Sequence, residues 1–208
     1  TMIRRMMGVC AVGAVALCVF AGQQDETAEL QRQIDALAAA GGGTLRIGPG
    51  DHRTGALFFK PGVRLHLAKG ARLVGASDPA AYPQALTRIE GQSRVYWPAI
   101  VNADRCDGFA ISGEGEIDGD GEETWRAFWT GLRADPRHFT NTDPSLLRPR
   151  VLYVSNSKDV DISGVTFRNS RFWTTHFYRC TGVSVHDCTI VAEVLMGTCG
   201  PSTDAIDI

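Results

Sequence analysis

A repeated pattern near the end of the sequence limits the folds open to this chain more than any other feature. Residues 157–167 and 180–190 align without a gap, at an offset of 23 residues. The aligned apolar pairs are Val160 with Val183, Ile162 with Val185, Val165 with Cys188 and Phe167 with Ile190. Each copy alternates apolar and polar positions, which is typical of a short strand with one buried face.

A weaker copy of the pattern occurs earlier, where Phe109 and Ile111 take the places of Val160 and Ile162. A period near two dozen residues without a helix indicates the stacked coils of a parallel β-helix. A leucine-rich repeat has a similar period, but its Leu-x-x-Leu-x-Leu pattern is absent. An ordinary β-sandwich would explain the strands but not the repeat.

One helix is expected early in the chain, because Leu30, Ile34 and Leu37 recur on one helical face. Three glycines at 41–43 would end it. No second helix of that quality is expected after it.

Short apolar segments separated by glycine corners then predict strands at 44–47, 56–59, 63–67 and 71–74. Residues 119–150 break the repeat with several aromatic residues and prolines. We expect a long insertion from one corner of a coil, of the kind that often forms the wall of a groove.

The N-terminus is typical of an export signal. Two arginines precede an apolar run from Met6 to Phe20, which is too short for a membrane span, and Ala21 suits cleavage. We therefore predict a signal peptide at 1–21, a secreted or periplasmic location, and a single domain at 22–208. The formal net charge of −2 gives no overall basic field for binding nucleic acid.

Four cysteines remain after residue 21, namely Cys106, Cys180, Cys188 and Cys199. An oxidising compartment would allow them to form disulfides in three possible pairings, and burial as free thiols is an equal alternative. Their spacing matches no zinc pattern. We expect neither a metal nor a cofactor.

Residues 201–207, next to the last residue Ile208, read Pro-Ser-Thr-Asp-Ala-Ile-Asp, with two carboxylates three residues apart. This segment resembles the first catalytic motif of the polygalacturonases, glycoside hydrolase family 28, which typically reads Asn-Thr-Asp-Gly-(Ile/Val)-Asp. Ser202 stands where that pattern has Asn, and Ala205 where it has Gly. The resemblance also includes Gly-Glu-Gly-Glu-Ile-Asp-Gly at 113–119 and Phe-Trp-Thr-Thr-His at 172–176, in the family's order.

The resemblance implies an all-β fold, a right-handed parallel β-helix of the pectin-lyase-like type with an N-terminal capping helix. It also implies that the chain is truncated at its C-terminus, because the family's Asp-Asp pair and later motifs do not occur in it. We expect these 208 residues to be an incomplete and inactive portion of the enzyme.

The resemblance assigns a catalytic role to Asp204, which would position and activate water in an inverting hydrolysis. The acid of that reaction would belong to the missing Asp-Asp pair. Asp207 would lie on the opposite side of a regular strand, so we expect it to have a supporting or substrate-binding role.

Trp173 and His176 have the same spacing as Asp204 and Asp207, at an offset of 31 residues. If the register holds, Trp173 lies beside Asp204, where it could stack on a sugar ring or simply fill the core. We expect His176 to be a hydrogen-bonded wall residue that contacts substrate. The basic candidates for an anionic groove are Arg148, Arg150, Arg168, Arg171 and Arg179.

The expected partner is therefore a pectin or galacturonan polysaccharide, bound by a protein that is monomeric at full length and free of the membrane after signal cleavage. Two alternatives stay open. One is an eliminating enzyme like pectate lyase, which would need a calcium site. The other is a non-catalytic β-helix that binds carbohydrate.

Overall fold

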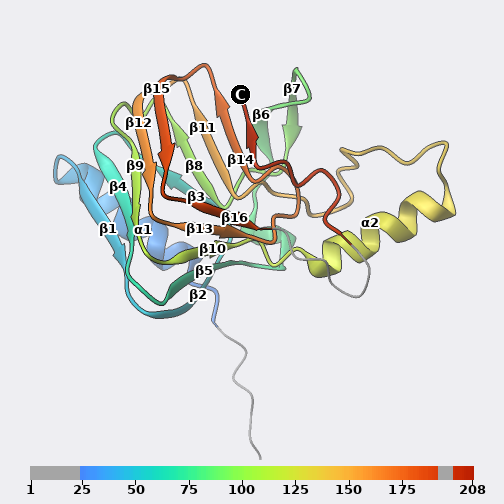
Figure 1. The fold of residues 1–208 in the computed structure, drawn as a ribbon, viewed down its shortest axis with the longest axis horizontal. Helices are drawn as coiled ribbons and strands as arrows, with labels where there is room; N and C mark the ends of the chain where they lie inside the picture. The colour runs from blue at the N-terminus through green and yellow to red at the C-terminus, as the bar shows by residue number, and fades with distance from the viewer. Residues whose placement is uncertain (1–23, 192–198) are drawn as a thin grey trace, which may run out of the picture.

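The chain coils through five rungs, each of which contributes one strand to each of three parallel sheets (Figure 1). The computed structural model describes residues 24–191 and 199–208, so the predicted signal peptide lies outside the described residues. The fold is all-β, a right-handed parallel β-helix, as predicted.

The strands of each sheet follow one another in sequence order. The first sheet contains β1 (Gly43–Ile47), β4 (Val63–Leu67), β9 (Ala110–Gly113), β12 (Lys158–Ser163) and β15 (Thr181–His186). The second contains β2 (Gly50–Thr54), β5 (Ala71–Gly75), β10 (Glu116–Asp118), β13 (Thr166–Arg168) and β16 (Thr189–Val191). The third contains β3 (Leu57–Phe59), β8 (Val101–Asp104), β11 (Leu152–Ser155), β14 (Thr175–Tyr178) and β17 (Ile206–Asp207).

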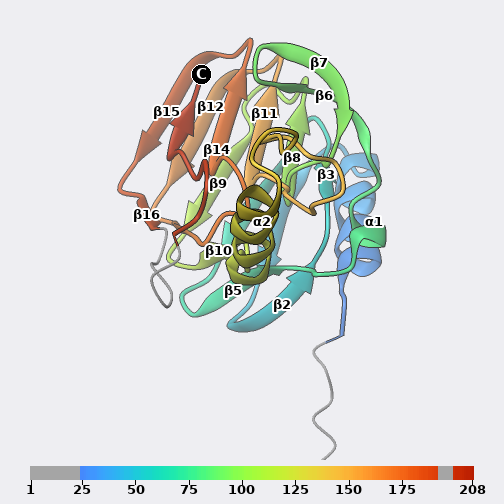
Figure 2. The same cartoon turned by 90° about the vertical axis from the view of Figure 1, so that its right-hand side faces the viewer.

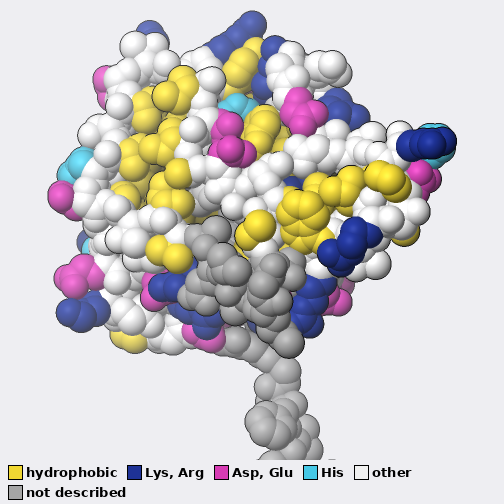
Figure 3. Space-filling view, turned by 45° about the vertical axis from the view of Figure 1, so that its right-hand side comes forward, with side chains coloured by type: hydrophobic (Ala, Val, Ile, Leu, Met, Phe, Trp, Pro, Cys, Tyr) yellow, Lys and Arg dark blue, Asp and Glu magenta, His cyan; other side chains and the backbone are white. Residues whose placement is uncertain are grey.

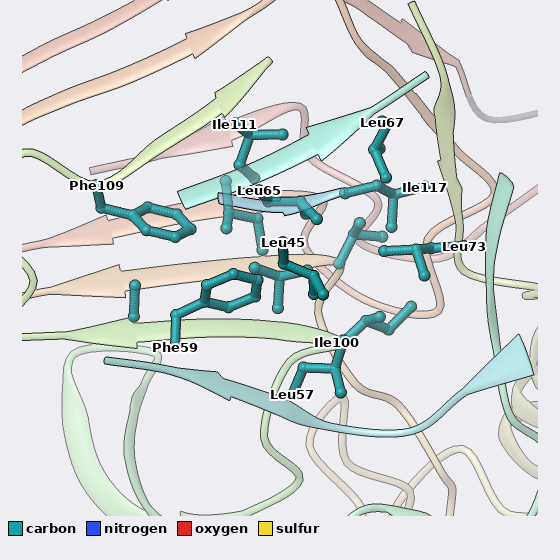
Figure 4. Packing of buried hydrophobic residues seen from close by; sticks show 14 of the residues in the cluster. Leu45, Leu57, Phe59, Leu65, Leu67, Leu73, Ile100, Phe109, Ile111 and Ile117 are labelled. Atoms are coloured by element: carbon teal, nitrogen blue, oxygen red, sulfur yellow. The ribbon is translucent and has the colours of Figure 1, made fainter. Parts of the chain in front are cut away.

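Residues that align in the sequence repeat pair with one another on adjacent rungs. Val160 pairs with Val183 and Phe167 pairs with Ile190, as the alignment predicts. The weaker copy is also in register, because Ile111 pairs with Ile162. Like residues therefore stack on like residues through the interior, which is filled by aliphatic and phenylalanine side chains (Figure 4).

Helix α1 (Thr27–Ala39) covers the first rung and buries Leu30 and Ile34 against it. Its end is closed by a hydrogen bond from the Gly42 N–H to the carbonyl of Leu37, at a glycine with a φ of 115°. A left-handed residue at this point is the usual end of a helix, and glycine adopts it without strain. The predicted capping helix is confirmed.

The described insertions leave the β-helix between the second and third sheets. The second rung carries the 3-10 turn η1 (Pro79–Ala81) and the hairpin of β6 (Ala85–Ile89) and β7 (Gln92–Tyr96). The third rung carries α2 (Glu122–Ala134) within the predicted insertion. Figure 2 shows the hairpin and α2 on the same side of the β-helix.

The expectation that no second helix follows α1 is wrong. Helix α2 buries Trp125 and Phe128, which lie three residues apart and therefore share one face. It packs its aromatic face on the outside of the coil rather than contributing to the repeating core, so the repeat does not reveal it.

The four cysteines of the described residues are free thiols, of which Cys106 is buried, Cys180 and Cys188 are partly buried, and Cys199 is exposed. Cys106 belongs to the core, and Cys180 and Cys188 pack against it. The alternative of burial without pairing therefore holds for these three. Within the described ranges, no helix has both the length and the apolar character needed to cross a membrane.

The last rung exposes large apolar side chains. Val183, Ile206 and Ile208 are the exposed members of this surface. Figure 3 shows hydrophobic side chains gathered on the side of the molecule where this rung lies. In the inner rungs the equivalent positions are buried, because the next coil covers them.

Candidate active site

One row of side chains runs along the outer face of the third sheet. Cross-strand pairing places Phe58, Asn102, Tyr153, His176 and Asp207 on five successive rungs. Rungs lie about 4.8 Å apart, and the alternation of a strand directs neighbouring residues into the core. The row therefore forms the floor of a continuous outer surface that ends at Asp207.

The predicted offset of 31 residues between the last two rungs is confirmed. His176 pairs with Asp207, and the Thr174 N–H donates a 2.8 Å hydrogen bond to the carbonyl of Asp204. The same offset places Asp204 one rung beyond Trp173. Asp204 itself is exposed, whereas Asp207 is half-buried.

The prediction that Asp204 and Asp207 point to opposite sides assumed one regular strand through both residues, but β17 contains only Ile206 and Asp207. Trp173 and His176, at the same two positions one rung earlier, meet edge to face with ring centroids 5.1 Å apart. The charge of Asp204 also raises the pKa of Asp207, which places the two carboxyl groups near one another. The alternation of a regular strand therefore does not apply to Asp204, which precedes β17 in an irregular segment.

Burial raises the pKa of Asp207 to about 6, the charge of Asp204 adds to this effect, and Arg150 opposes it. The Oδ2 atom of Asp207 is buried and accepts no hydrogen bond from the described residues. With a pKa of about 6, Asp207 exchanges its proton near pH 6, and its Oδ2 atom is open to a further donor.

Arg150 stabilises this row of side chains through hydrogen bonds and a cation–π contact. It donates hydrogen bonds to Nδ1 of His176 (2.7 Å), to Oγ1 of Thr87 (2.6 Å) and to the carbonyl of Arg88 (3.1 Å). Its guanidinium carbon lies 4.0 Å from the ring centroid of Tyr153. Burial lowers the pKa of Arg150 to about 10, which leaves it charged at neutral pH.

His176 is a neutral imidazole under ordinary conditions. Burial and the nearby charges of Arg150 and Arg88 lower the pKa of His176 to about 3. Because Nδ1 accepts the hydrogen bond from Arg150, the single ring proton is assigned to Nε2. His176 can therefore donate one hydrogen bond and is suited to a neutral wall position.

Trp173 is half-buried and stacks on Phe172, with ring centroids 4.8 Å apart and an angle of 19° between the ring planes. On the far side of Phe172 lies the guanidinium of Arg148, 4.6 Å from the Phe172 centroid and 4.5 Å from that of Phe128. Arg148 also donates a 2.5 Å hydrogen bond to the carbonyl of Pro201. The insertion thereby holds the segment that carries Asp204.

The remaining arginine candidates do not line this surface together. Arg171 is buried and bonds to backbone carbonyls, and Arg168 pairs with Glu116 (3.1 Å) on the second sheet. Arg179 is exposed beside the ring of Tyr178. Sequence reasoning missed Arg88, because only the fold brings the β6–β7 hairpin next to β14.

Among the residues that the structure describes, no group of three or more histidine, cysteine, aspartate or glutamate side chains is placed to hold a metal ion. The site therefore offers carboxylates, a neutral imidazole and an aromatic ring on one exposed surface. This set of groups suits the hydrolysis or binding of a polar ligand that has apolar ring faces.

Several known proteins are similar to this chain in sequence and in fold. An exopolygalacturonase of Zea mays is 27% identical over 191 residues, which cover 89% of this chain and 40% of that protein. The endo-xylogalacturonan hydrolase A of Aspergillus tubingensis is 25% identical over 76% of this chain and 35% of its own length. The chain thus spans well under half of these curated relatives.

Solved structures agree with the fold. The exopolygalacturonase of Thermotoga maritima superposes with a TM-score of 0.67 at 26% identity, over 81% of this chain and 44% of that one. The polygalacturonase of Erwinia carotovora gives a TM-score of 0.65 at 20% identity, over 84% and 47% of the two chains. The sequence model of glycosyl hydrolases family 28 matches residues 79–208, more than half of the chain. The protein is a member of glycosyl hydrolases family 28.

Proposed function

We propose that this chain forms the N-terminal rungs of a polygalacturonase, which hydrolyses the α-1,4-galacturonosidic bonds of pectin with inversion. The observation that carries the proposal is the shared outer face of the last two rungs. There Trp173 and His176 occupy the positions that Asp204 and Asp207 occupy one rung later. Family membership supports the same reaction class.

In this proposal Asp204 positions and activates the attacking water, which its exposure allows. The Nε2–H of His176 donates to a sugar oxygen, and the half-exposed ring of Trp173 packs on the apolar face of a sugar ring. Asp207 offers its unpaired Oδ2 to the substrate and, below about pH 6, a carboxyl proton as well.

Inversion also needs an acid, which should stand roughly 6.5–9.5 Å from the base so that water fits between them. The resemblance assigns this acid to an Asp-Asp pair, and no such pair occurs in the 208 residues. We therefore propose that these residues bind the substrate but do not cleave it without the later rungs.

The test is hydrolysis of polygalacturonate by the gene product that contains these residues. We expect new reducing ends, an inverted anomer in the first product by NMR, and no double bond in the products. Asp204→Asn should lower kcat by roughly 10²–10⁴-fold, while Asp35→Asn on α1 should not change it. Unsaturated products, or unchanged hydrolysis by the Asp204 variant, would contradict the proposal.

We also propose that the protein is exported, with residues 1–21 removed, and that it works as a monomer. The charged and apolar pattern of the first 21 residues supports export. N-terminal sequencing of the protein from the periplasm or the medium should begin at Gly22, and light scattering should give a monomer mass. A protein retained in the cytoplasm with its first residues intact would contradict export.

A further inference from the structure

The direction in which the chain enters Asp204 depends on Ser202, two residues earlier. Strand β17 begins only at Ile206, and the Thr174 N–H bonds to the carbonyl of Asp204 itself. Ser202 precedes this point and has a φ of 53°. A residue other than glycine keeps such a left-handed conformation only where its surroundings hold it there. The contacts of Ser202 therefore help to set the position of Asp204.

Asn141, in the insertion after α2, contacts the side chain of Ser202. Its Oδ1 atom accepts a 3.0 Å hydrogen bond from Oγ of Ser202 and a second of 3.0 Å from the guanidinium of Arg148. The backbone carbonyl of Asn141 also accepts from Arg148. Arg148 donates in turn to the carbonyl of Pro201, the residue before Ser202. One amide oxygen and one guanidinium thus hold two successive residues of this segment.

The partners of Asn141 fix the orientation of its side-chain amide. Its Nδ2 atom donates a 3.0 Å hydrogen bond to Oε1 of Glu90, in the two-residue turn between β6 and β7. A flipped amide would direct N–H groups at the guanidinium of Arg148 and its oxygen at the carboxylate of Glu90. Because a guanidinium only donates and an ionised carboxylate only accepts, these neighbours allow one orientation. That orientation directs Oδ1 at Ser202.

Further hydrogen bonds anchor the insertion around Asn141. Arg94 of β7 donates a 2.8 Å hydrogen bond to Oγ1 of Thr142, which is buried beside Asn141 in the sequence. Trp129 of α2 donates a 2.8 Å hydrogen bond to the carbonyl of Cys199. The insertion is therefore attached both to the hairpin and to the segment that leads to Asp204. Asn141 is positioned by these attachments before it contacts Ser202.

We propose that Asn141 is a positioning residue of the hydrolase. Its Oδ1 atom holds Ser202 in the left-handed conformation and thereby directs the exposed carboxylate of Asp204 at the attacking water. A misplacement of about 1 Å at a reacting group can cost about 10²-fold in rate, so a restraint on this backbone affects the reaction. The inference rests on the proposed function for the role of Asp204. It adds a residue that lies 61 positions from Ser202 in the sequence.

Steady-state hydrolysis of polygalacturonate by the gene product that contains these residues is the first test. Asn141→Leu removes the acceptor with little change in side-chain size, so we expect kcat to fall about tenfold while KM stays unchanged. Asn141→Asp keeps an acceptor oxygen for Ser202 and Arg148 and should restore kcat to within about twofold. Gln33→Leu, which removes an exposed amide on α1, is the control and should change neither constant.

Ser202→Ala tests whether the effect of Asn141 passes through Ser202. It removes the hydroxyl donor and should lower kcat about as much as Asn141→Leu does. The double variant should be no slower than Asn141→Leu alone, because the two changes remove the same hydrogen bond. Multiplied losses in the double variant, or an unchanged kcat in Asn141→Leu, would overturn the proposal.

Hydrogen exchange of this chain measures the restraint without any need for catalysis. Amides in residues 199–205 should exchange about tenfold faster in Asn141→Leu than in the unchanged chain or in Asn141→Asp, with β9 and β10 unaffected. Equal exchange in the three proteins would overturn the positioning role whatever the activity. Faster exchange in Asn141→Leu, with no hydrolysis by the unchanged gene product, would instead contradict the proposed function alone.

Discussion

Arg150 donates a 2.7 Å hydrogen bond to Nδ1 of His176, across the boundary between the third and fourth rungs. The same guanidinium bonds to Thr87 and to the carbonyl of Arg88 on the hairpin. One buried cation thus fixes the proton position of a groove residue and attaches the hairpin to the sheet. The row of side chains on the third sheet and the β6–β7 hairpin share this support.

Arg150→Met should therefore affect both places. We expect the free energy of unfolding to fall by about 2–4 kcal/mol, because charged hydrogen bonds are lost while buried acceptors remain. The pKa of His176 should rise, since the charge of Arg150 helps to lower it, although burial should keep it below 6.5. Urea unfolding and an NMR titration of His176 measure the two effects.

Arg46→Met, at an exposed position on β1, is the control and should change neither quantity. A variant of Arg150 that unfolds like the unchanged chain, with the same His176 pKa, would show that these hydrogen bonds do not form in solution.

The pKa shifts of His176 and Asp207 should give stability opposite dependences on pH. The folded state holds His176 at a pKa of about 3, below 6.5, so stability falls as the pH falls from 6.5 toward 3. It holds Asp207 at a pKa of about 6, above 3.8, so stability falls as the pH rises from 3.8 to 6. Between these limits the two contributions oppose each other.

Single substitutions should separate them. His176→Asn removes the loss of stability on acidification, so this variant should gain stability relative to the unchanged chain as the pH falls. Asp207→Asn removes the opposite contribution, so this variant should lose stability more steeply than the unchanged chain. Unfolding in urea at several pH values between about 4 and 6.5 measures both slopes. Parallel curves for all three proteins would show that neither group has the assigned pKa.

Arg148→Met should loosen the segment that carries Asp204. The variant loses the cation–π contacts of the Arg148 guanidinium with the rings of Phe128 and Phe172. It also loses the hydrogen bond from that guanidinium to the carbonyl of Pro201. Desolvated cation–π contacts contribute about 2 kcal/mol each, so amide exchange in residues 199–208 should accelerate by about tenfold or more. Hydrogen exchange with mass spectrometry measures this against Arg133→Met, an exposed substitution on α2, the helix that carries Phe128. Equal acceleration in β9 and β10 would indicate global destabilisation instead.

Ser202 and Ala205 depart from the family's motif, and replacing each with the family's residue should change the free energy of unfolding in opposite directions. Ser202 has a φ of 53°, in the left-handed region that Asn adopts more readily than Ser. We expect Ser202→Asn to raise the free energy of unfolding by about 0.5–1 kcal/mol, part of the roughly 1–2 kcal/mol that a left-handed residue costs. Ala205 is outside that region, so Ala205→Gly should lower it by about 0.4–1 kcal/mol. Thermal unfolding checks both, and a reversed order would contradict the assigned backbone.

The sequence predicted the coil register because stacked rungs bury the same position again and again. Val160 and Val183 are both apolar because each fills the same position of its rung. Residues that align in the sequence therefore also pair in the structure. Strand β2 escaped prediction because Asp51, His52 and Arg53 leave no apolar alternation to read. Its position follows from pairing with β5, which local sequence does not encode.

The alternation and repeat of apolar residues by themselves predicted the β-helix and its register, and the motif resemblance with the offset of 31 residues predicted the two acidic positions at its last rung. The tertiary structure decided which polar residues face the groove. Arg150 looked like a candidate for the groove lining, yet the hairpin covers it and turns it into a support, while Arg88 comes from that hairpin. The physical reason is that burial of a repeating core depends on local pattern, whereas the environment of a charge depends on which distant segment packs over it.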